Sequence, residues 1–366
     1  MNQSSTFNQL KKILRPIKRW VDFIFSEIDS LIINMAVKSI FLSNLYYLFR
    51  FKFGWEHRAV LAGKKIYKQS LKDPKHNTSL LRRNTHRLEK GLLMRPRRVP
   101  FGLNYIQETV EAFERAVEFQ TEHKELIWAK HVLNEYMDIT PSHQIIEPLR
   151  DVVNKASLKI EEYDVLEQKR IPYVRAQWDA SQITYDELLK LAKYRRSVRW
   201  FLQDKVDREL INKAITIAAY SPTACNRQPY EFRIFDDQQL VSEIIKLPMG
   251  TTGFGHQVPN VAVVIGKLRN YYDERDRHLI YIDASLAIMS FVYALEVQGI
   301  SSCCINWPDV PVLESKMRQL LGLELDERPI MLIAFGYPEP EGMVANSVKK
   351  PVDTLCKYNF IGKKGE

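Results

Sequence analysis

Two short polar segments in the second half of the chain combine residue types that bind small anions. The first is Arg195-Arg196-Ser197-Val198-Arg199, and the second is Ser221-Pro222-Thr223-Ala224-Cys225-Asn226-Arg227-Gln228-Pro229. Guanidinium groups donate several charge-assisted hydrogen bonds at once, so the arginine segment favours an anionic ligand. The second segment offers short polar side chains and backbone amides on a turn bounded by prolines, which suits the polar edge of a flat heterocycle. Together the two segments indicate a flavin nucleotide.

Each segment has a simpler interpretation when it is taken alone. The arginines are compatible with a solvated helix end, where cations interact favourably with the helix dipole. Asn226 could satisfy its own backbone, although its amide can also donate to and accept from a flavin edge. Cys225 has no histidine nearby in the sequence to activate it, so we interpret it as a packing residue. The close succession of the two segments favours cofactor binding.

The elements that must position these segments are helices. Thr184 and Glu187 have the spacing of a capping box, which predicts a helix that carries Leu188, Leu189 and Ala192 inward and ends at the arginines. Asp207 can cap the next helix, whose apolar face stops before Ser221 and Pro222. The polar turn is therefore expected to follow directly from a buried helix.

Strands and further helices are predicted beyond the turn. Residues 230–235 alternate in strand fashion, and residues 261–265 form a β-branched run typical of an interior strand. Residues 283–298 predict a buried helix that ends at Gly299. Two more strands are expected at residues 302–305 and 330–335, with a helix at residues 312–321 between them.

Helices account for everything predicted before residue 180. Apolar residues at helical spacing mark residues 105–120 and 126–137, residues 155–168 predict a charged helix, and residues 172–182 read as a connector. No strand is expected before residue 225. We therefore predict a helical region over residues 1–180 and a second domain over residues 181–366.

The composition indicates a globular protein without a metal site. The chain has 366 residues, of which 45% are hydrophobic, and this length predicts two domains rather than one. Its four cysteines lack the paired spacing of a zinc site or a disulfide framework, which fits a reducing cytosol. The sequence has no GxGxxG loop for a nicotinamide cofactor.

The positive charge of the chain is concentrated at its N-terminal end. Residues 1–100 contain 21 lysines and arginines against 6 acidic residues, so this stretch carries +15 and the remainder −6. No zinc finger, aromatic RNA-binding run or recognition helix accompanies the charge, so nucleic acid is not the expected partner. An anionic membrane surface fits better.

The first fifty residues are expected to contain a basic amphipathic helix. Lysines and arginines between residues 11 and 19 alternate with apolar residues up to Ile24, a pattern that can lie in a membrane interface or dock on the protein itself. Residues 30–51 are apolar, but Lys38 near their centre argues against a membrane span. No cleavable signal is evident. We therefore predict a cytoplasmic protein, with peripheral contact to the inner membrane face if the helix binds lipid.

Residues 194–340 resemble the nitroreductase family of flavin mononucleotide (FMN) enzymes. The matching elements, in family order, are the Arg195–Phe201 start, the Ser221–Pro229 turn with its aromatic strand, the Asp283 helix, the Gly299–Ile305 strand and the Phe335-Gly336-Tyr337-Pro338 ending. The resemblance implies an α+β fold with a mixed, largely antiparallel sheet flanked by helices, here preceded by an all-helical region. It also implies a homodimer with two FMN molecules at the interface.

The resemblance also assigns cofactor contacts. Arg195, Arg196, Ser197 and Arg199 would contact the phosphate and the pyrimidine side of the flavin, and the turn residues Pro222, Thr223, Ala224, Asn226 and Gln228 would approach from the other subunit. Asn306 and Trp307 lie where the family offers a backbone amide to flavin N5, and Lys349 and Lys350 lie where it often places a basic residue on the phosphate. Glycine is common at the N5 position, so packing is the alternative for Trp307, and simple solvation is the alternative for the lysines.

The implied activity needs no catalytic side chain. A hydride would pass from NADH or NADPH through flavin N5 to an organic acceptor, such as a nitroaromatic, a quinone or an unsaturated metabolite. One alternative is a specialised flavin enzyme of polysaccharide or peptide modification, and another is a scaffold that keeps the fold without turnover.

One further motif lies in the N-terminal region. Residues 84–92, followed by Arg95, Arg97 and Arg98, resemble extensions on nitroreductase-like proteins of bacterial polysaccharide gene clusters. His86, Glu89 and Lys90 would share a helix face, where they form either an ion-pair lattice or a site for an anion such as a sugar phosphate.

Overall fold

The computed structural model describes residues 20, 23–24, 26–161 and 169–362. The chain divides into two compact units, Met1–Arg58 and Ala59–Glu366. The boundary that the sequence predicts near residue 180 lies inside the second unit, and most of the predicted amphipathic helix lies outside the described residues. Helix α3 (Gly54–Ser70) begins in the first unit and continues into the second.

The first unit contains a helical hairpin. Residues 26–36 are helical and are followed by α2 (Ile40–Arg50), which Ser39 caps by accepting a hydrogen bond from the amide of Leu42 at 3.1 Å. Asp29 accepts a hydrogen bond from Tyr46 at 3.2 Å and pairs with Arg50. No residue of α2 is buried, so its apolar side chains are open to solvent within this unit.

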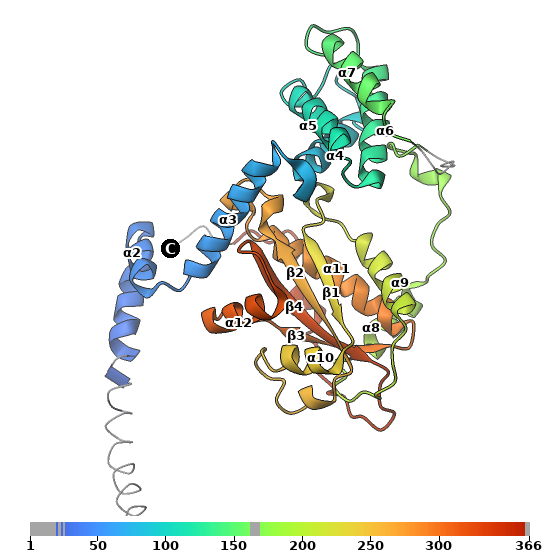
Figure 1. Cartoon of the computed structure of the whole chain (residues 1–366). Coiled ribbons are helices and arrows are strands. Elements are labelled where there is room, and N and C mark those ends of the chain that lie inside the picture. The colour runs from blue at the N-terminus through green and yellow to red at the C-terminus, as the bar shows by residue number, and fades with distance from the viewer. Residues whose placement is uncertain (1–19, 21–22, 25, 162–168, 363–366) are drawn as a thin grey trace, which may run out of the picture. The chain divides into compact units, whose positions relative to one another are not determined.

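The sheet of the second unit has four antiparallel strands (Figure 1). They are β1 (Tyr230–Phe235), β2 (Asn260–Lys267), β3 (Ser301–Asn306) and β4 (Glu327–Gly336), in the order β1-β2-β4-β3. In β2, Val261 is opposite Phe235 on one side and Ala334 on the other. The two central strands are almost entirely buried because helices cover both faces, which explains their continuous apolar runs.

Each face of the sheet has its own core. Helices α9 (Arg208–Ala219) and α11 (Leu279–Glu296) pack on the face that contains Ala262 and Val264. Helices α10 (Gln238–Ile245) and α12 (Pro311–Leu321) pack on the opposite face, which contains Val261 and Val263. The predicted α+β fold, with its largely antiparallel sheet flanked by helices, is confirmed.

The longest helix of the sheet core is rich in apolar residues. Among the described residues, the stretch Glu274–Glu296 alone is long and apolar enough to cross a membrane. It contains α11, whose residues Ala284, Ala287 and Phe291 are buried against the sheet. Its hydrophobicity is therefore that of a core helix.

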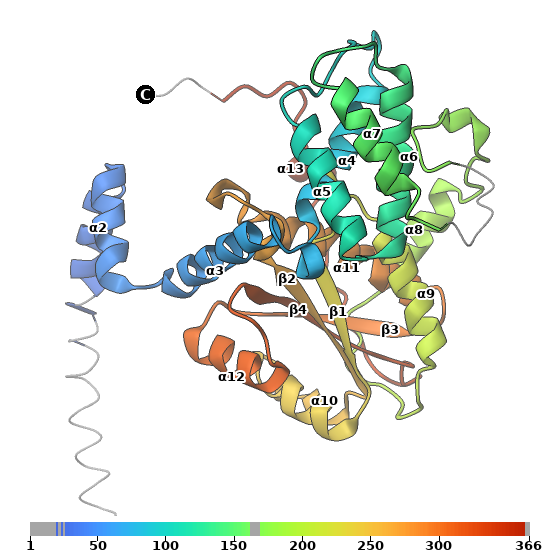
Figure 2. The same ribbon diagram turned by 45° about the horizontal axis from the view of Figure 1, so that its top comes forward.

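A second group of helices precedes the sheet and forms its own core (Figure 2). These are α4 (Ser79–Leu92), α5 (Ile106–Glu118), α6 (His123–Ile139) and α7 (Glu147–Ser157), which we call the helical bundle. Leu88, Phe113, Leu133 and Tyr136 are fully buried in it. The helix predicted over residues 155–168 is wrong in its described part, because α7 ends at Ser157 and a turn follows.

The helices around the candidate segments also test the predictions. The capping box of α8 (Tyr185–Tyr194) and the Asp207 cap of α9 are confirmed. The inward face predicted for α8 is wrong for Leu188, which is 51% exposed, while Leu189 and Ala192 are only half-buried. None of the residues of α8 is fully buried, so its apolar face does not form part of a core among the described residues. A short α13 (Val352–Leu355) follows the last strand.

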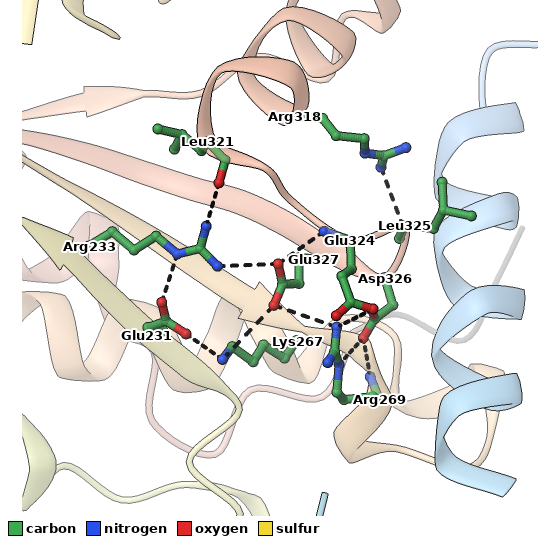
Figure 3. A network of polar contacts seen from close by, with 10 residues as sticks. All are labelled: Glu231, Arg233, Lys267, Arg269, Arg318, Leu321, Glu324, Leu325, Asp326 and Glu327. Atoms are coloured by element: carbon green, nitrogen blue, oxygen red, sulfur yellow. Dashed lines mark hydrogen bonds and ion pairs between the residues drawn. The ribbon is translucent and has the colours of Figure 1, made fainter. Parts of the chain in front are cut away.

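An ion network closes one end of the sheet (Figure 3). Arg269 forms a bidentate pair with the fully buried Asp326, with N–O distances of 2.7 and 2.6 Å. Arg233 bonds Glu231 at 2.7 Å and Glu327 at 3.3 Å, and Lys267 pairs with Glu231. The charges are mutually compensated, which is the condition under which buried ions are tolerated.

Candidate functional site

The arginine segment lies beside the edge strand β3. Arg195 is the C-cap of α8, and its amide donates to the carbonyl of Leu191. The next residues run alongside the sheet, since the Val198 amide donates to the carbonyl of Ser302 at 3.1 Å. This confirms the predicted position of the cluster at a helix exit.

Two guanidinium groups of this segment donate hydrogen bonds to backbone carbonyls. Arg196 donates to the carbonyl of Arg195 at 2.9 Å, and Arg199 donates to that of Ser197 at 3.2 Å. Arg199 also lies over the ring of Phe254, 5.6 Å from its centroid. Within the part of the chain that the structure describes, neither these two groups nor that of Arg195 pairs with a carboxylate. Their positive charge is therefore available to a ligand.

Two groups on β3 respond to this environment. The hydroxyl of Ser302 is buried without a hydrogen-bond partner. Burial raises the pKa of the Cys303 thiol, and the charges of Arg199 and Arg195 and a hydrogen bond with Ser197 oppose the rise. The unpaired cations, with an unsatisfied hydroxyl on the neighbouring strand, fit the FMN phosphate that the family resemblance implies.

The polar turn has an unusual backbone. Within it, η3 (Ala224–Asn226) includes Cys225 and Asn226 at φ of 54° and 52°, and Gln228 follows at 47°. Three non-glycine residues with positive φ in four positions are costly, so the surrounding contacts must hold them in place. The Gln228 amide donates to the hydroxyl of Thr223 at 3.1 Å, which closes the turn on itself.

Asp283 of α11 holds the turn from one side. Its Oδ2 accepts hydrogen bonds from the amide of Ala224 at 3.0 Å and from the hydroxyl of Tyr271 at 3.1 Å. Burial raises the pKa of Asp283, and these hydrogen bonds and the charge of Arg227 work against the rise. The sequence predicts Asp283 only as the start of a helix, because nothing local marks it as a partner of a turn 59 residues earlier.

Arg82 of the helical bundle holds the turn from the other side. Its guanidinium donates to the carbonyl of Asn226 at 2.9 Å and to the side-chain oxygen of Gln228 at 3.1 Å. The same group pairs with Glu125 at 2.8 Å, a carboxylate whose side chain is only 5% exposed. Burial raises the pKa of Glu125, and Arg82 is the main influence that lowers it. Arg82 is a functional candidate that the sequence did not single out.

Further contacts join α3 and the start of α4 to the segment that directly follows β2. Asn77 donates to the carbonyl of Arg269 at 2.6 Å, and Ser79 bonds Asn270. Gly63 of α3 lies against Leu268, where an added Cβ would come within 2.8 Å of backbone. Helices α3 and α4 therefore contact the segment that follows β2 through polar bonds as well as packing.

The side chain of Asn226 is available for the ligand contact that the sequence predicts. Its side-chain amide has no hydrogen-bond partner among the residues described, while its backbone amide and carbonyl bond Thr223 and Arg82. The side chain is thus free to reach a ligand. The side chain of Gln228, by contrast, bonds Ala219 and Arg82 and supports the turn itself.

Among the described residues, no hydrogen bond or ion pair joins the turn directly to the arginine segment, although the charge of Arg195 also acts on Glu296 of α11. The arginine segment contacts β3, whereas the turn contacts α4 and α11. Helix α9 lies between them in the sequence and, with 12 residues, spans about 18 Å.

The remaining predicted residues have different environments. Trp307 is 7% exposed, and its indole donates a hydrogen bond to the Glu314 carboxylate at 2.7 Å. This environment corresponds to the alternative in which Trp307 is a packing residue. Asn306 is exposed at the end of β3. Lys349 and Lys350 are exposed on the segment after β4. No group of histidines, cysteines and carboxylates in the described ranges could hold a metal ion.

The motif of residues 84–92 divides between two surfaces of α4. His86 lies 3.3 Å from Glu89, which also accepts a hydrogen bond from Trp128 at 2.9 Å. The contact between His86 and Glu89 is the one expected if the motif forms ion pairs on the helix surface. Lys90 is exposed and lines a cavity with Arg83 and Arg87 instead.

Comparison with protein families adds an independent finding. The model described as "Nitroreductase family" matches residues 192–252 and 249–337. These ranges contain the arginine segment, the turn and all four strands. The helical bundle lies outside them.

Individual proteins match the same half of the chain. A protein of Archaeoglobus fulgidus, named as an NADH dehydrogenase/NAD(P)H nitroreductase, is 28% identical over 165 residues, 43% of this chain and 88% of the relative. Iodotyrosine deiodinase 1 of Pongo abelii is 23% identical over 198 residues, 46% of this chain and 67% of that protein. The structure of an FMN-dependent nitroreductase from Clostridium difficile is 20% identical, with a TM-score of 0.40, and covers 47% of this chain and 99% of its own.

Proposed function

Because residues 192–337 form a domain of the nitroreductase family of oxidoreductases, we propose that the chain is an FMN-dependent enzyme. It passes a hydride from NADH or NADPH to an organic acceptor. The observation that carries the proposal is the arginine segment without carboxylate partners, followed by a polar turn with a free Asn226 amide. FMN, when bound, supplies two-electron transfer at its N5 atom.

The residues of the arginine segment have the task of binding and charge stabilisation. Arg195, Arg196 and Arg199 with Ser197 bind the phosphate and the pyrimidine side of the cofactor. Their fixed positive charge favours the electron-rich reduced ring, because donors already in place need no rearrangement during reaction. The side-chain amide of Asn226 orients the ring edge.

The same site is completed by a second copy of the chain. No hydrogen bond or ion pair joins the arginine segment to the turn among the described residues of one chain, and in the proposed assembly two copies bring the two segments to one flavin. Apolar side chains at the start of α8 are available for this interface, since Ile183 is 71% exposed, Tyr185 77% and Leu188 51%. The proposed assembly is a homodimer with two FMN molecules.

For a nitroaromatic acceptor, the reaction balances without a further reagent. One NAD(P)H and one proton convert the nitro group to a nitroso group and water, with NAD(P)⁺ as the oxidised product. Relatives named as NAD(P)H nitroreductases and as iodotyrosine deiodinases support the redox class of the proposal.

The proposal is tested by oxidation of NADH and NADPH in the presence of nitroaromatic and quinone acceptors. We expect acceptor-dependent oxidation by the FMN-loaded protein, with ping-pong kinetics. Turnover only on a glycan or peptide intermediate would favour a specialised modifying enzyme. FMN-loaded protein that oxidises neither nicotinamide with any acceptor would support a scaffold and overturn the proposal.

We also propose that the first unit binds an anionic membrane surface from the cytoplasmic side. Its helix α2 exposes large apolar side chains, including Ile40 at 83% and Phe49 at 74%, beside a strongly basic sequence. The full-length protein should sediment with anionic liposomes and be released by high salt. Equal sedimentation with neutral liposomes would contradict the electrostatic part, and absence of sedimentation with either would contradict the whole.

A further inference from the structure

A large cavity lies between the helical bundle and the sheet domain. Its volume is about 860 Å³, within the range that binds organic molecules. Helices α3, α4 and α5 form one side, and Cys225, Arg227 and the segment of Tyr272 and Arg275 form the other. The cavity is therefore built by elements that are far apart in the sequence.

The lining of the cavity is strongly cationic. Its six basic residues are Arg83, Arg87, Lys90, Arg115, Arg227 and Arg275. Two acidic residues, Glu108 and Glu111, also line the cavity, and Asp276 pairs with Arg227 at 4.0 Å and with Arg275 at 3.8 Å, so the six cations exceed these three carboxylates by three. Both glutamates already pair with arginines, at 3.2 Å to Arg83 and 3.9 Å to Arg115. A ligand with two or more negative charges would relieve the repulsion that remains.

Aromatic rings hold several of these arginines in position. Arg83 and Arg275 lie over the ring of Tyr272, 5.3 and 5.6 Å from its centroid, and Arg87 lies 3.6 Å from the centroid of the Tyr105 ring. Stacking of this kind leaves the N–H edges of a guanidinium available to oxygen acceptors. The lining is thus arranged in advance, which reduces the entropic cost of binding.

Arg227 is a buried cation of the lining whose ion pair is long. Its side chain is only 6% exposed, yet its nearest carboxylate, Asp276, is 4.0 Å away. Its guanidinium also lies over the ring of Tyr271, 4.9 Å from the centroid, and its charge acts on the buried Asp283. A buried charge with so distant a counterion is costly, and a bound anion would compensate it.

The position of the cavity connects it with the redox site. Cys225 and Arg227 belong to the polar turn, on either side of Asn226. Tyr67, Leu71 and Leu80 add apolar and aromatic surface to the lining, which favours a ligand with an organic part over a bare inorganic ion.

We propose that this cavity binds a phosphorylated organic molecule and presents it to the flavin beside the turn as the acceptor. This assignment of a substrate class rests on the proposed function. The phosphate groups would be held by Arg83, Arg87 and Arg227, and the organic part would lie toward Cys225. The bundle then has a role of its own, because it supplies most of the cations.

The binding step is tested without redox activity. Calorimetric titration of the full-length, FMN-loaded protein with inorganic pyrophosphate should show one saturable site per chain that weakens with salt. The Arg83→Gln/Arg87→Gln variant should weaken binding at least about tenfold, because each arginine contributes a charge-assisted hydrogen bond. Lys90 is exposed and has no partner among the described residues. The Lys90→Gln variant should therefore fold normally and bind pyrophosphate about threefold more weakly.

The matched control removes the same charge elsewhere. Arg208 and Lys213 lie on α9, with side chains 73% and 61% exposed, and do not line the cavity. Arg208→Gln/Lys213→Gln should leave pyrophosphate affinity unchanged. Equal weakening by the control and by Arg83→Gln/Arg87→Gln, or no saturable binding in the unmodified protein, would overturn the site.

The acceptor role is tested by comparing two nitroaromatics, 4-nitrophenyl phosphate and the neutral 4-nitrobenzyl alcohol. Arg83→Gln/Arg87→Gln should raise KM for the phosphate ester at least about tenfold more than it raises KM for the alcohol. Equal effects on the two acceptors would overturn the acceptor role.

The two proposals fail in different ways. Pyrophosphate binding without FMN uptake would contradict the proposed function and leave the anion site standing. FMN uptake and nitroaromatic reduction without pyrophosphate binding would contradict the anion site alone.

Discussion

The chain contains two groups of arginines that differ in how they are built. Arg195, Arg196 and Arg199 are neighbours in sequence and lie at the exit of one helix. The cavity arginines come from α4, α5, the turn and the segment after β2, and only the folded chain brings them together. The first group is held mainly by its own backbone carbonyls, while the second is held by aromatic rings and carboxylates. A contiguous cluster can be found by reading the sequence, whereas a distributed one needs the structure.

The difference also concerns what each group can recognise. The contiguous cluster lies beside an edge strand and within the residues that the nitroreductase family model matches, and we propose that it serves cofactor binding. The distributed cluster depends on the helical bundle, which lies outside the matched residues. Specificity for a substrate is therefore expected from the part of the chain that the family does not share.

The two groups of arginines should bind different ligands, so a change in the first group should affect FMN and leave pyrophosphate binding intact. Arg195→Ala/Arg199→Ala should lower FMN affinity roughly 10³-fold, about 4 kcal/mol, because two charge-assisted contacts are lost. Fluorescence titration with FMN measures this, and circular dichroism should show unchanged helix content. Pyrophosphate affinity should stay the same in this variant. Unaltered FMN affinity would show that the cofactor site lies elsewhere.

A second prediction concerns the contact between the two regions. Arg82→Ala should lower the free energy of unfolding by about 3 kcal/mol, since it leaves Glu125 buried without its partner and releases Asn226 and Gln228. Chemical denaturation measures this. Arg82→Ala/Glu125→Gln should recover part of the loss.

The neighbouring residue provides the control for this prediction. Arg83→Ala removes a cation from the same helix, but its partner Glu108 is 45% exposed and can be solvated. We expect a cost below about 1 kcal/mol. Similar losses for Arg82→Ala and Arg83→Ala would mean that the contact with the turn is unimportant.

A smaller effect is expected at Asp283, beneath the turn. Its pKa is raised by burial, so the folded state holds the proton more tightly than the unfolded state. Its contribution to stability is complete below the unfolded pKa and is lost as pH rises through the folded pKa. Asp283→Asn should therefore gain stability relative to the unmodified protein as pH rises through this window, measured by urea unfolding at several pH values.

Glu187 provides a control of opposite sign. Hydrogen bonds from the backbone and side chain of Thr184 lower the pKa of Glu187. The stability that Glu187 contributes is present above its unfolded pKa and is lost as pH falls through its folded pKa. The Glu187→Gln variant should therefore be less stable than the unmodified protein near neutral pH, and this difference should disappear in acid. A parallel pH dependence for the Asp283 and Glu187 variants would contradict the assigned environments.

The sequence predicts those features that depend on neighbouring residues. The capping box at Thr184, the Asp207 cap and the interior strand at residues 261–265 are confirmed because each follows from local hydrogen bonding or hydropathy. The position of the arginines at a helix exit follows from the same logic.

Features that depend on tertiary contacts could not be predicted in this way. Arg82 and Asp283 hold the turn from 144 and 59 residues away in the sequence, respectively, and no local pattern distinguishes them from surface residues. Leu188 has the spacing of a core residue, yet the chain provides no surface to cover it. The second copy of the chain proposed above would cover this face, and the spacing of apolar residues along one sequence does not reveal such a partner.

The central claim is that the arginine segment and the polar turn form an FMN site. An absorbance spectrum of the purified protein, recorded before and after anaerobic addition of NADH or NADPH, tests it most directly. We expect a yellow protein with one FMN per chain whose visible absorbance is bleached by at least one of the two nicotinamides. A colourless protein that does not take up added FMN would contradict it.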